Sequence, residues 1–219
     1  MKKRLTRRTF LARVALAIGS VSLLSSCIRT KQSESSLESE MTPGSGFQKE
    51  LIKNRQLPKE LVMTQLDQRV DLAMQRSHHC AQSSFLALNE QFSLEGEQVL
   101  KALTPLPGVA ERGETCGAVI GPLMAFGLIY GRGQLQMDNW EKYQESLVPA
   151  GKLCSRFEQE FGSLMCHDIQ KVKFGRCYHL TDPDELRKFQ EAGATDHCSD
   201  VVRKAVRMAA EIVLEDQSL

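Results

Sequence analysis

The uncharged stretch CGAVIGPLMAFGLIYG, residues 116–131, decides how the chain around it folds. Thr115 precedes the stretch and offers an N-cap, while Gly131 and Gly133 follow a continuous run of small and apolar residues. Because threonine favours helix starts and glycine favours helix ends, the pattern predicts a helix over residues 116–130. Pro122 lies inside this run and removes one backbone hydrogen bond of a helix. We therefore expect the helix either to start nearer Pro122 or to bend there.

One side of this predicted helix carries almost no side-chain atoms. Gly117 and Gly121 are one turn apart and share a face, which Ala125 continues. Bare backbone allows the close approach of another helix or of a cofactor. Either tight helix packing or a cofactor is therefore expected on this face.

The rest of the body also has helical spacing. Apolar side chains recur every three or four residues from Pro58 to Cys80, and a second such run continues from Cys80 to Phe92. Further helices are expected at 97–103, 164–171, 184–192 and 198–214, and residues 105–113 are expected to form a loop. A long helix is expected from its cap Asp138 to Phe161, kinked or split by Pro149 and Gly151. No segment alternates with a period of two. The sequence thus predicts an all-α, compact domain of about six to eight helices.

Charge is unevenly distributed along the 219 residues. Residues 1–26 hold six of the 28 Lys and Arg residues and no acid, which leaves 22 cations against 27 anions in the remainder. A mildly acidic body argues against nucleic-acid binding, because neutralising phosphates needs a cationic face. The 42% of apolar residues suffices for a core and excludes fibrous and wholly disordered proteins. No GxSxG, HExxH, Walker or GxGxxG motif occurs, so a classical enzyme is not expected.

The N-terminus has the layout of a bacterial export signal. Residues 1–26 carry a basic segment with the pair Arg7 and Arg8, followed by uncharged residues too few to span a bilayer. The pair resembles the twin-arginine signature, whose transporter moves folded proteins. Leu24-Ser25-Ser26-Cys27 resembles a lipobox, which predicts lipidation of Cys27 and attachment to a membrane; the alternative is a plain cleaved signal. Residues 27–46 then form a flexible tether, and 47–219 form the helical domain.

Six cysteines follow Cys27, and their spacing identifies no metal. The sequence contains no CxxC and no CxxCH, so zinc ribbons, thioredoxin motifs and c-type haem attachment are not supported. Four of the six lie at or near predicted helix ends: Cys80, Cys116, Cys166 and Cys198. A helix N-terminus lowers the pKa of a thiol, and Cys116 and Cys198 are best placed for this effect. The alternative is that these are buried core residues or structural disulfides.

The other two cysteines give weaker signals. Cys154 lies on the apolar stripe of the long helix and is expected in the core, whereas Cys177 is a loop residue of unclear role. A disulfide between them is open on the sequence alone.

The segment Cys116-Gly117-Ala118-Val119-Ile120-Gly121 resembles the signature of the redox-active family labelled C_GCAxxG_C_C. The label spells Gly-Cys-Ala where this chain has Cys-Gly-Ala. The order of the cysteines is also similar, with Cys80 upstream and Cys166 and Cys198 downstream. The resemblance covers roughly residues 60–215 and implies a redox protein with a four-cysteine centre. A related region occurs in haem-bearing split-Soret cytochromes, but this chain lacks their CxxCH.

Four functions remain open from the sequence. The first is electron transfer by an iron–sulfur cluster on Cys80, Cys116, Cys166 and Cys198, which export in the folded state would protect. The second is thiol–disulfide exchange by Cys116 with a neighbour such as Cys80. The third is a structural lipoprotein stapled by disulfides, and the fourth is a zinc protein. The expected partners are a redox protein and a membrane holding the lipid, with no nucleic acid.

Overall fold

The computed structural model of this chain describes residues 44–219. Within them the chain forms ten α-helices and no β-strand, which confirms the all-α prediction. The helices are α2 (Ser45–Gln56), α3 (Lys59–Ser77), α4 (Cys80–Phe92), α5 (Glu97–Ala102), α6 (Gly108–Glu111), α7 (Gly117–Tyr130), α8 (Trp140–Phe161), α9 (Cys166–Phe174), α10 (Pro183–Glu191) and α11 (Ala194–Glu215), with a 3-10 helix η1 (Gln134–Gln136) between α7 and α8. None of the helices in this part of the chain is long and apolar enough to cross a membrane.

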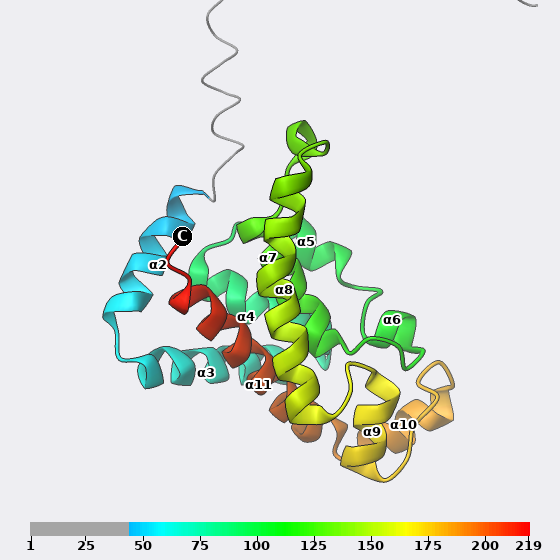
Figure 1. Cartoon of the computed structure of the whole chain (residues 1–219). Helices are drawn as coiled ribbons and strands as arrows, with labels where there is room; N and C mark the ends of the chain where they lie inside the picture. The colour runs from blue at the N-terminus through cyan, green and yellow to red at the C-terminus, as the bar shows by residue number, and fades with distance from the viewer. Residues whose placement is uncertain (1–43) are drawn as a thin grey trace, which may run out of the picture. The chain divides into compact units, whose positions relative to one another are not determined.

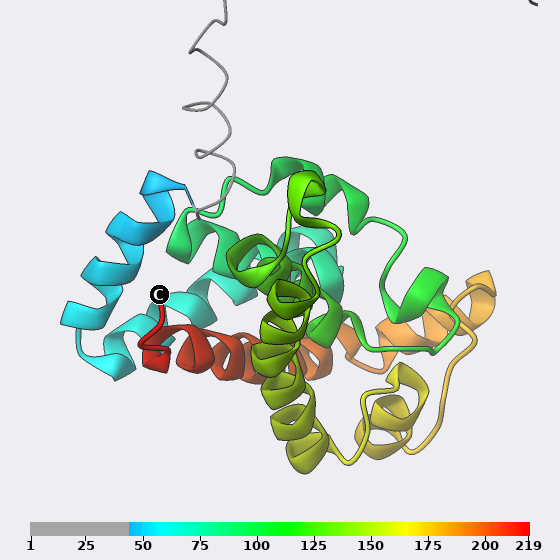
Figure 2. The same ribbon diagram turned by 45° about the horizontal axis from the view of Figure 1, so that its top comes forward.

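Helix α4 lies at the centre of the domain. It packs against α3, α7 and α11, and its side chains Phe85, Leu88 and Phe92 are buried in the core. Helix α8 crosses α7 and α11, while α9 and α10 gather beside the start of α11 (Figures 1 and 2). Residues at or near the N-terminal ends of α4, α7, α9 and α11 line one cavity.

Helix α7 has Cys116 as its N-cap, so the prediction that Thr115 caps it is wrong. Thr115 instead pairs with Met165 in an antiparallel bridge, whose two flanking hydrogen bonds are made by the backbones of the neighbouring residues. The helix begins at Gly117 and continues through Pro122 to Tyr130, so it does not start nearer the proline. Pro122 is buried, and packing of this apolar helix outweighs the loss of one hydrogen bond.

Helix α8 shows a similar small correction at its start. The cap is Asn139 and not Asp138, because the Asn139 side chain accepts a hydrogen bond from the N–H of Lys142 at 2.9 Å. The helix runs without a break through Pro149 and ends at Gly162, whose φ of +77° suits glycine. Pro149 therefore does not split the helix.

Three further boundaries differ from the sequence prediction. Helix α2 was not anticipated, and it starts at Ser45, inside the predicted tether. The predicted loop 105–113 contains the turn α6, in which Gly108 and the next three residues have positive φ. Helix α11 begins at Ala194, so Cys198 is its fifth residue and not its first.

Candidate four-cysteine site

The structure brings together the four cysteines at predicted helix ends. Cys80 is the first residue of α4, Cys116 is the N-cap of α7, Cys166 is the first residue of α9 and Cys198 lies in the second turn of α11. All four line one cavity of about 30 Å³. We call these residues the four-cysteine site.

Glycine permits the approach of α7 to α4 at this site. A Cβ atom added to Gly117 would overlap the Cys80 sulfur and lie 2.7 Å from the backbone nitrogen of Ala81. A Cβ atom on Gly121 would overlap Ser84 Oγ in the same way. The bare side of α7 therefore lets two helices pack closely, and it places Cys116 beside Cys80.

A short antiparallel contact joins Cys116 to Cys166. The backbone N–H of Cys116 donates to the carbonyl of Leu164 at 2.8 Å, and that of Cys166 donates to the carbonyl of Glu114 at 2.7 Å. The Thr115–Met165 bridge lies between these two hydrogen bonds. Cys116 is the N-cap of α7 and Cys166 is the first residue of α9. The contact therefore holds the N-termini of these two helices side by side.

The turn α6 packs against Cys166. Gly108 has a φ of +51°, and a Cβ added there would lie 3.4 Å from the Cβ of Cys166. Val109, Ala110 and Glu111 also have positive φ, a conformation costing roughly 1–2 kcal/mol per non-glycine residue. Such backbone strain is commonly found at functional sites.

Among the four cysteines, Cys166 is the one whose thiol pKa is lowered. Its pKa is lowered to about 7, mainly because the Cys116 thiol donates a hydrogen bond to it. The Nε2 of Gln170 donates a second hydrogen bond to the Cys166 sulfur at 3.3 Å, and His167 adds a favourable charge. Cys166 is therefore the cysteine that most readily forms a thiolate.

Cys116 and Cys198, the two predicted sites of low thiol pKa, behave in the opposite way. Hydrogen bonding to Cys166 and Cys80, together with burial, raises the pKa of Cys116 well above its usual value. Burial raises the pKa of Cys198, which lies beyond the first turn of α11. The prediction was wrong because hydrogen bonding of the Cys116 thiol in its neutral form, and desolvation of the Cys198 thiolate, exceed the effect of a nearby helix N-terminus.

Gln170 is a site residue that sequence reasoning missed. It is buried, and it holds α9 to the loop after it by accepting the N–H of Tyr178 at 2.8 Å while its amide donates to Cys166. Its only signal in the sequence is a position one helical turn after Cys166. A glutamine at such a position is too common to stand out.

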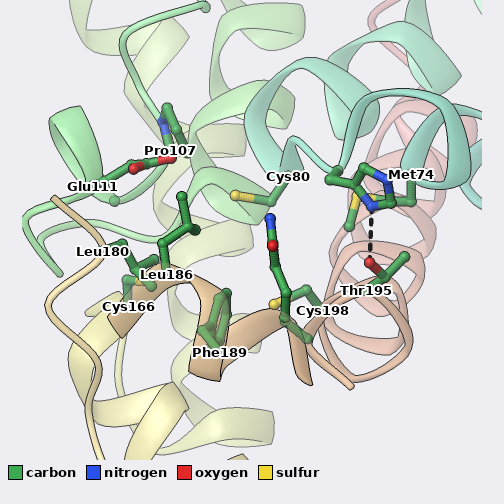
Figure 3. Close-up of a pocket in the computed structure, with 14 residues that line it drawn as sticks. Met74, Cys80, Pro107, Glu111, Cys166, Leu180, Leu186, Phe189, Thr195 and Cys198 are labelled. Atoms are coloured by element: carbon green, nitrogen blue, oxygen red, sulfur yellow. Dashed lines mark hydrogen bonds between the residues drawn. The ribbon is translucent and has the colours of Figure 1, made fainter. Parts of the chain in front are cut away.

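An apolar cleft of about 90 Å³ opens onto the site. Cys80, Cys166 and Cys198 line both this cleft and the inner cavity (Figure 3). Most of its lining is apolar, from Met74, Pro107, Leu180, Leu186, Phe189 and Ala194, and polar side chains also line it: His78, Glu111, Gln190 and Thr195. The cleft therefore gives a reactant access to three of the four sulfurs.

The two remaining described cysteines lie outside the site. Cys154 packs against the core from α8, as predicted, and Cys177 follows α9, with its thiol donating to the Tyr178 carbonyl at 3.6 Å. Neither is in a disulfide, so the bridge left open between them is absent here. All six cysteines in residues 44–219 are free. Cys27, Arg7 and Arg8 lie outside the described residues.

No group of three or more His, Cys, Asp or Glu side chains in residues 44–219 is placed to hold a metal ion. The four thiols match an iron–sulfur cluster in number and in ligand type. The cavity between them is about 30 Å³, near the volume of one water molecule, so a cluster would require these side chains to move apart.

Comparison with known proteins identifies a family. A family model described as "Putative redox-active protein (C_GCAxxG_C_C)" matches residues 78–212, which include the whole four-cysteine site. No curated protein and no solved structure matches the chain.

Proposed function

The chain belongs to this family of redox-active proteins, and from that premise we propose that its four-cysteine site holds an iron–sulfur cluster for electron transfer. One observation carries the proposal: four thiols from four separate helices face one cavity. A dithiol needs only two of them, and inert core cysteines have no reason to converge. Four cysteine ligands are the usual set for [2Fe–2S] and [4Fe–4S] clusters.

Helix N-termini offset part of the cost of placing negative charge at this buried site. Three of the cysteines stand at helix N-termini, where unpaired N–H groups and the helix dipole stabilise anions. Lys173 also lines the cavity. Binding of iron would supply the remaining compensation for the thiolates of Cys116 and Cys198, whose pKa values are raised in the metal-free site.

The roles of individual residues follow from their contacts. Cys80, Cys116, Cys166 and Cys198 would be the ligands, and the cluster would supply one-electron redox chemistry. Gln170 donates a hydrogen bond to the Cys166 sulfur, a contact that stabilises the more reduced, more negative state. The apolar walls of the cleft limit contact between the site and water.

The low pKa of Cys166 supports a second candidate, thiol–disulfide exchange. The Cys166 thiolate would attack one sulfur of a substrate disulfide and release the other as a thiolate. Cys116 would then pass its proton to the second substrate sulfur as its own sulfur attacks Cys166. The substrate would leave as one thiol and one thiolate, which takes its proton from water, and Cys116 and Cys166 would be oxidised to a disulfide.

The proposal extends to the place where the protein works. The twin-arginine pair Arg7 and Arg8 supports export of the folded protein, which would preserve a cluster inserted in the cytoplasm. The lipobox ending at Cys27 supports a lipid anchor on the outer side of the cytoplasmic membrane or beyond it. A redox protein in that compartment is the expected partner.

The test is a visible absorption spectrum of protein purified without oxygen. We expect broad absorption from the wild type, and its loss in Cys80→Ser, Cys116→Ser, Cys166→Ser and Cys198→Ser. Cys154→Ser and Cys177→Ser are matched controls outside the site and should keep the colour. The second candidate would be established by a different pair of results. The wild type would be colourless, and the Cys116→Ser variant would trap a mixed disulfide on Cys166.

A further inference from the structure

The turn between α7 and α8 exposes an unusual set of apolar side chains. We call residues 131–140 the hairpin tip. Leu135 is 59% exposed, Met137 is 67% exposed and Trp140 is 62% exposed. Figure 1 shows this turn projecting beyond the rest of the domain. Apolar residues at a projecting point are costly in water unless another apolar phase receives them.

Hydrogen bonds and ring contacts hold the hairpin tip in one conformation. The Arg132 guanidinium donates to the carbonyl of Met137 at 2.6 Å and to that of Asn139 at 3.2 Å. Arg132 also lies 4.8 Å above the ring of Tyr143, whose centroid is 4.9 Å from that of Trp140. The arginine thus closes the turn from inside and leaves the apolar side chains facing outward.

The chain enters the described domain close to this hairpin. Ser45, at the start of α2, and Lys142, near the start of α8, line the same groove. Gly44 follows Cys27 by 17 positions, and a tether of the kind that the sequence predicts would span roughly 20–25 Å over that length. A lipid on Cys27 would therefore keep this end of the domain near a bilayer.

The charges around the tip favour insertion by apolar contact. Arg132 and Lys142 are balanced by Asp138 and Glu141, so the tip has no net attraction for anionic lipid. A tryptophan beside a tyrosine and a basic residue is typical of side chains at the membrane–water interface. A protein partner would more commonly meet a flat or concave apolar surface, whereas the tip is convex.

We propose that the hairpin tip inserts Leu135, Met137 and Trp140 into the interfacial region of a lipid bilayer. This membrane contact is separate from the chemistry of the four-cysteine site. Helix α7 has 14 residues and is about 20 Å long, and Cys116 caps its opposite end. Insertion of the tip would therefore hold the four-cysteine site away from the lipid and open to a water-soluble partner.

The single tryptophan of the chain makes the proposal directly measurable. The full-length protein is mixed with phosphatidylcholine vesicles, with and without brominated acyl chains. We expect the emission of Trp140 to shift to the blue on binding and to be quenched by the bromines, equally at low and high salt. Emission that stays unshifted and unquenched, whether or not the protein sediments with the vesicles, would overturn the proposal.

A relocated fluorophore separates the tip from the lipid anchor. Val172 on α9 is 75% exposed, so a variant combining Val172→Trp with Trp140→Phe carries its fluorophore at an exposed apolar position away from the tip. Its emission should not be quenched by the brominated lipid. Quenching of this double variant equal to that of the wild type would contradict membrane insertion by the tip. A blue shift of the Trp140 emission that occurs without vesicles, through self-association of the protein, would also contradict membrane insertion by the tip.

Substitutions of the apolar side chains measure their share in binding. Leu135→Ser with Met137→Ser should weaken vesicle partition on the order of tenfold, because less apolar surface enters the bilayer. Leu72→Ser removes a side chain that is 69% exposed on α3 and should leave partition unchanged. Equal partition of these two variants would also contradict the proposal.

Discussion

Cys116 and Cys166 are joined through their backbones by a short antiparallel contact. Each donates its N–H across the Thr115–Met165 bridge, to Leu164 and Glu114 respectively, and the neighbouring Cys116 thiol lowers the pKa of Cys166. The helix N-termini of α7 and α9 are thereby fixed next to each other. The relative position of these two sulfurs thus depends on backbone pairing and not on side-chain packing alone.

Close packing of α7 on α4 is the first property to test. Gly117→Ala would force a Cβ onto the Cys80 sulfur and the Ala81 backbone, so we expect it to destabilise the fold by about 1–3 kcal/mol and to disturb the site. Gly127→Ala is the control on the same helix, because a Cβ there meets nothing within 4 Å. It should stabilise the fold by about 0.5–1 kcal/mol. Urea unfolding measures both, and equal effects would refute the packing argument.

Titration of Cys166 gives a prediction about pH. The hydrogen bond from Cys116 lowers the pKa of Cys166 to about 7, so alkylation of Cys166 in the metal-free protein should rise through pH 7 and then level off. The thiolate stabilises the fold above the pKa of an unfolded thiol, about 8.5, and this contribution is lost as the pH falls through 7.

Variants at its two hydrogen-bond donors test the cause of this shift. Cys116→Ala removes the larger contribution and should move the alkylation midpoint to higher pH. Gln170→Leu removes the smaller one and should move it less, although it also leaves the N–H of Tyr178 without its acceptor. A midpoint near pH 7 in both variants would show that these donors do not set the pKa.

Access to the site should depend on the apolar cleft. Leu186 lines the cleft beside Cys80, Cys166 and Cys198. Leu186→Trp should slow the reaction of these thiols with a bulky aromatic disulfide reagent, and Leu186→Ala should accelerate it. A small alkylating agent should react at nearly the same rate with both variants. Reaction of the bulky reagent at the same rate in both would show that reactants reach the sulfurs by another route.

The N-terminal prediction is tested in cells. Arg7→Lys combined with Arg8→Lys should leave the protein in the cytoplasm, because the twin-arginine transporter requires the pair. Cys27→Ser should permit export but release the protein from the lipid anchor. Fractionation after each change measures the outcome. Export that does not respond to the arginine variants would assign the protein to a different route.

The sequence predicted the positions of the helices better than it predicted the burial and the pKa of the thiols. Helix α4 begins and ends at the predicted residues, Cys80 and Phe92, because its apolar period is strong and local. The sequence pattern places the start of α11 at Cys198, four residues late, because Asp196 and His197 resemble a cap, whereas the helix in fact follows the left-handed Gly193. That error, together with unpredictable burial, led to the wrong expectation for the pKa of Cys198.

The convergence of the four cysteines had no basis in their spacing. Cys80 and Cys198 are far apart in the chain, and only the packing of α4 against α11 brings them to one cavity. Resemblance to a family supplied the grouping, and the structure supplies its physical cause. Their role as cluster ligands stays a prediction.

The central claim is that the four-cysteine site holds an iron–sulfur cluster, and the iron and acid-labile sulfide content of anaerobically purified protein tests it most directly. We predict iron and sulfide in equal amounts, with at least two of each per chain, as four-cysteine clusters require. Protein with its fold intact and all six described thiols free, but without iron or sulfide, would contradict it.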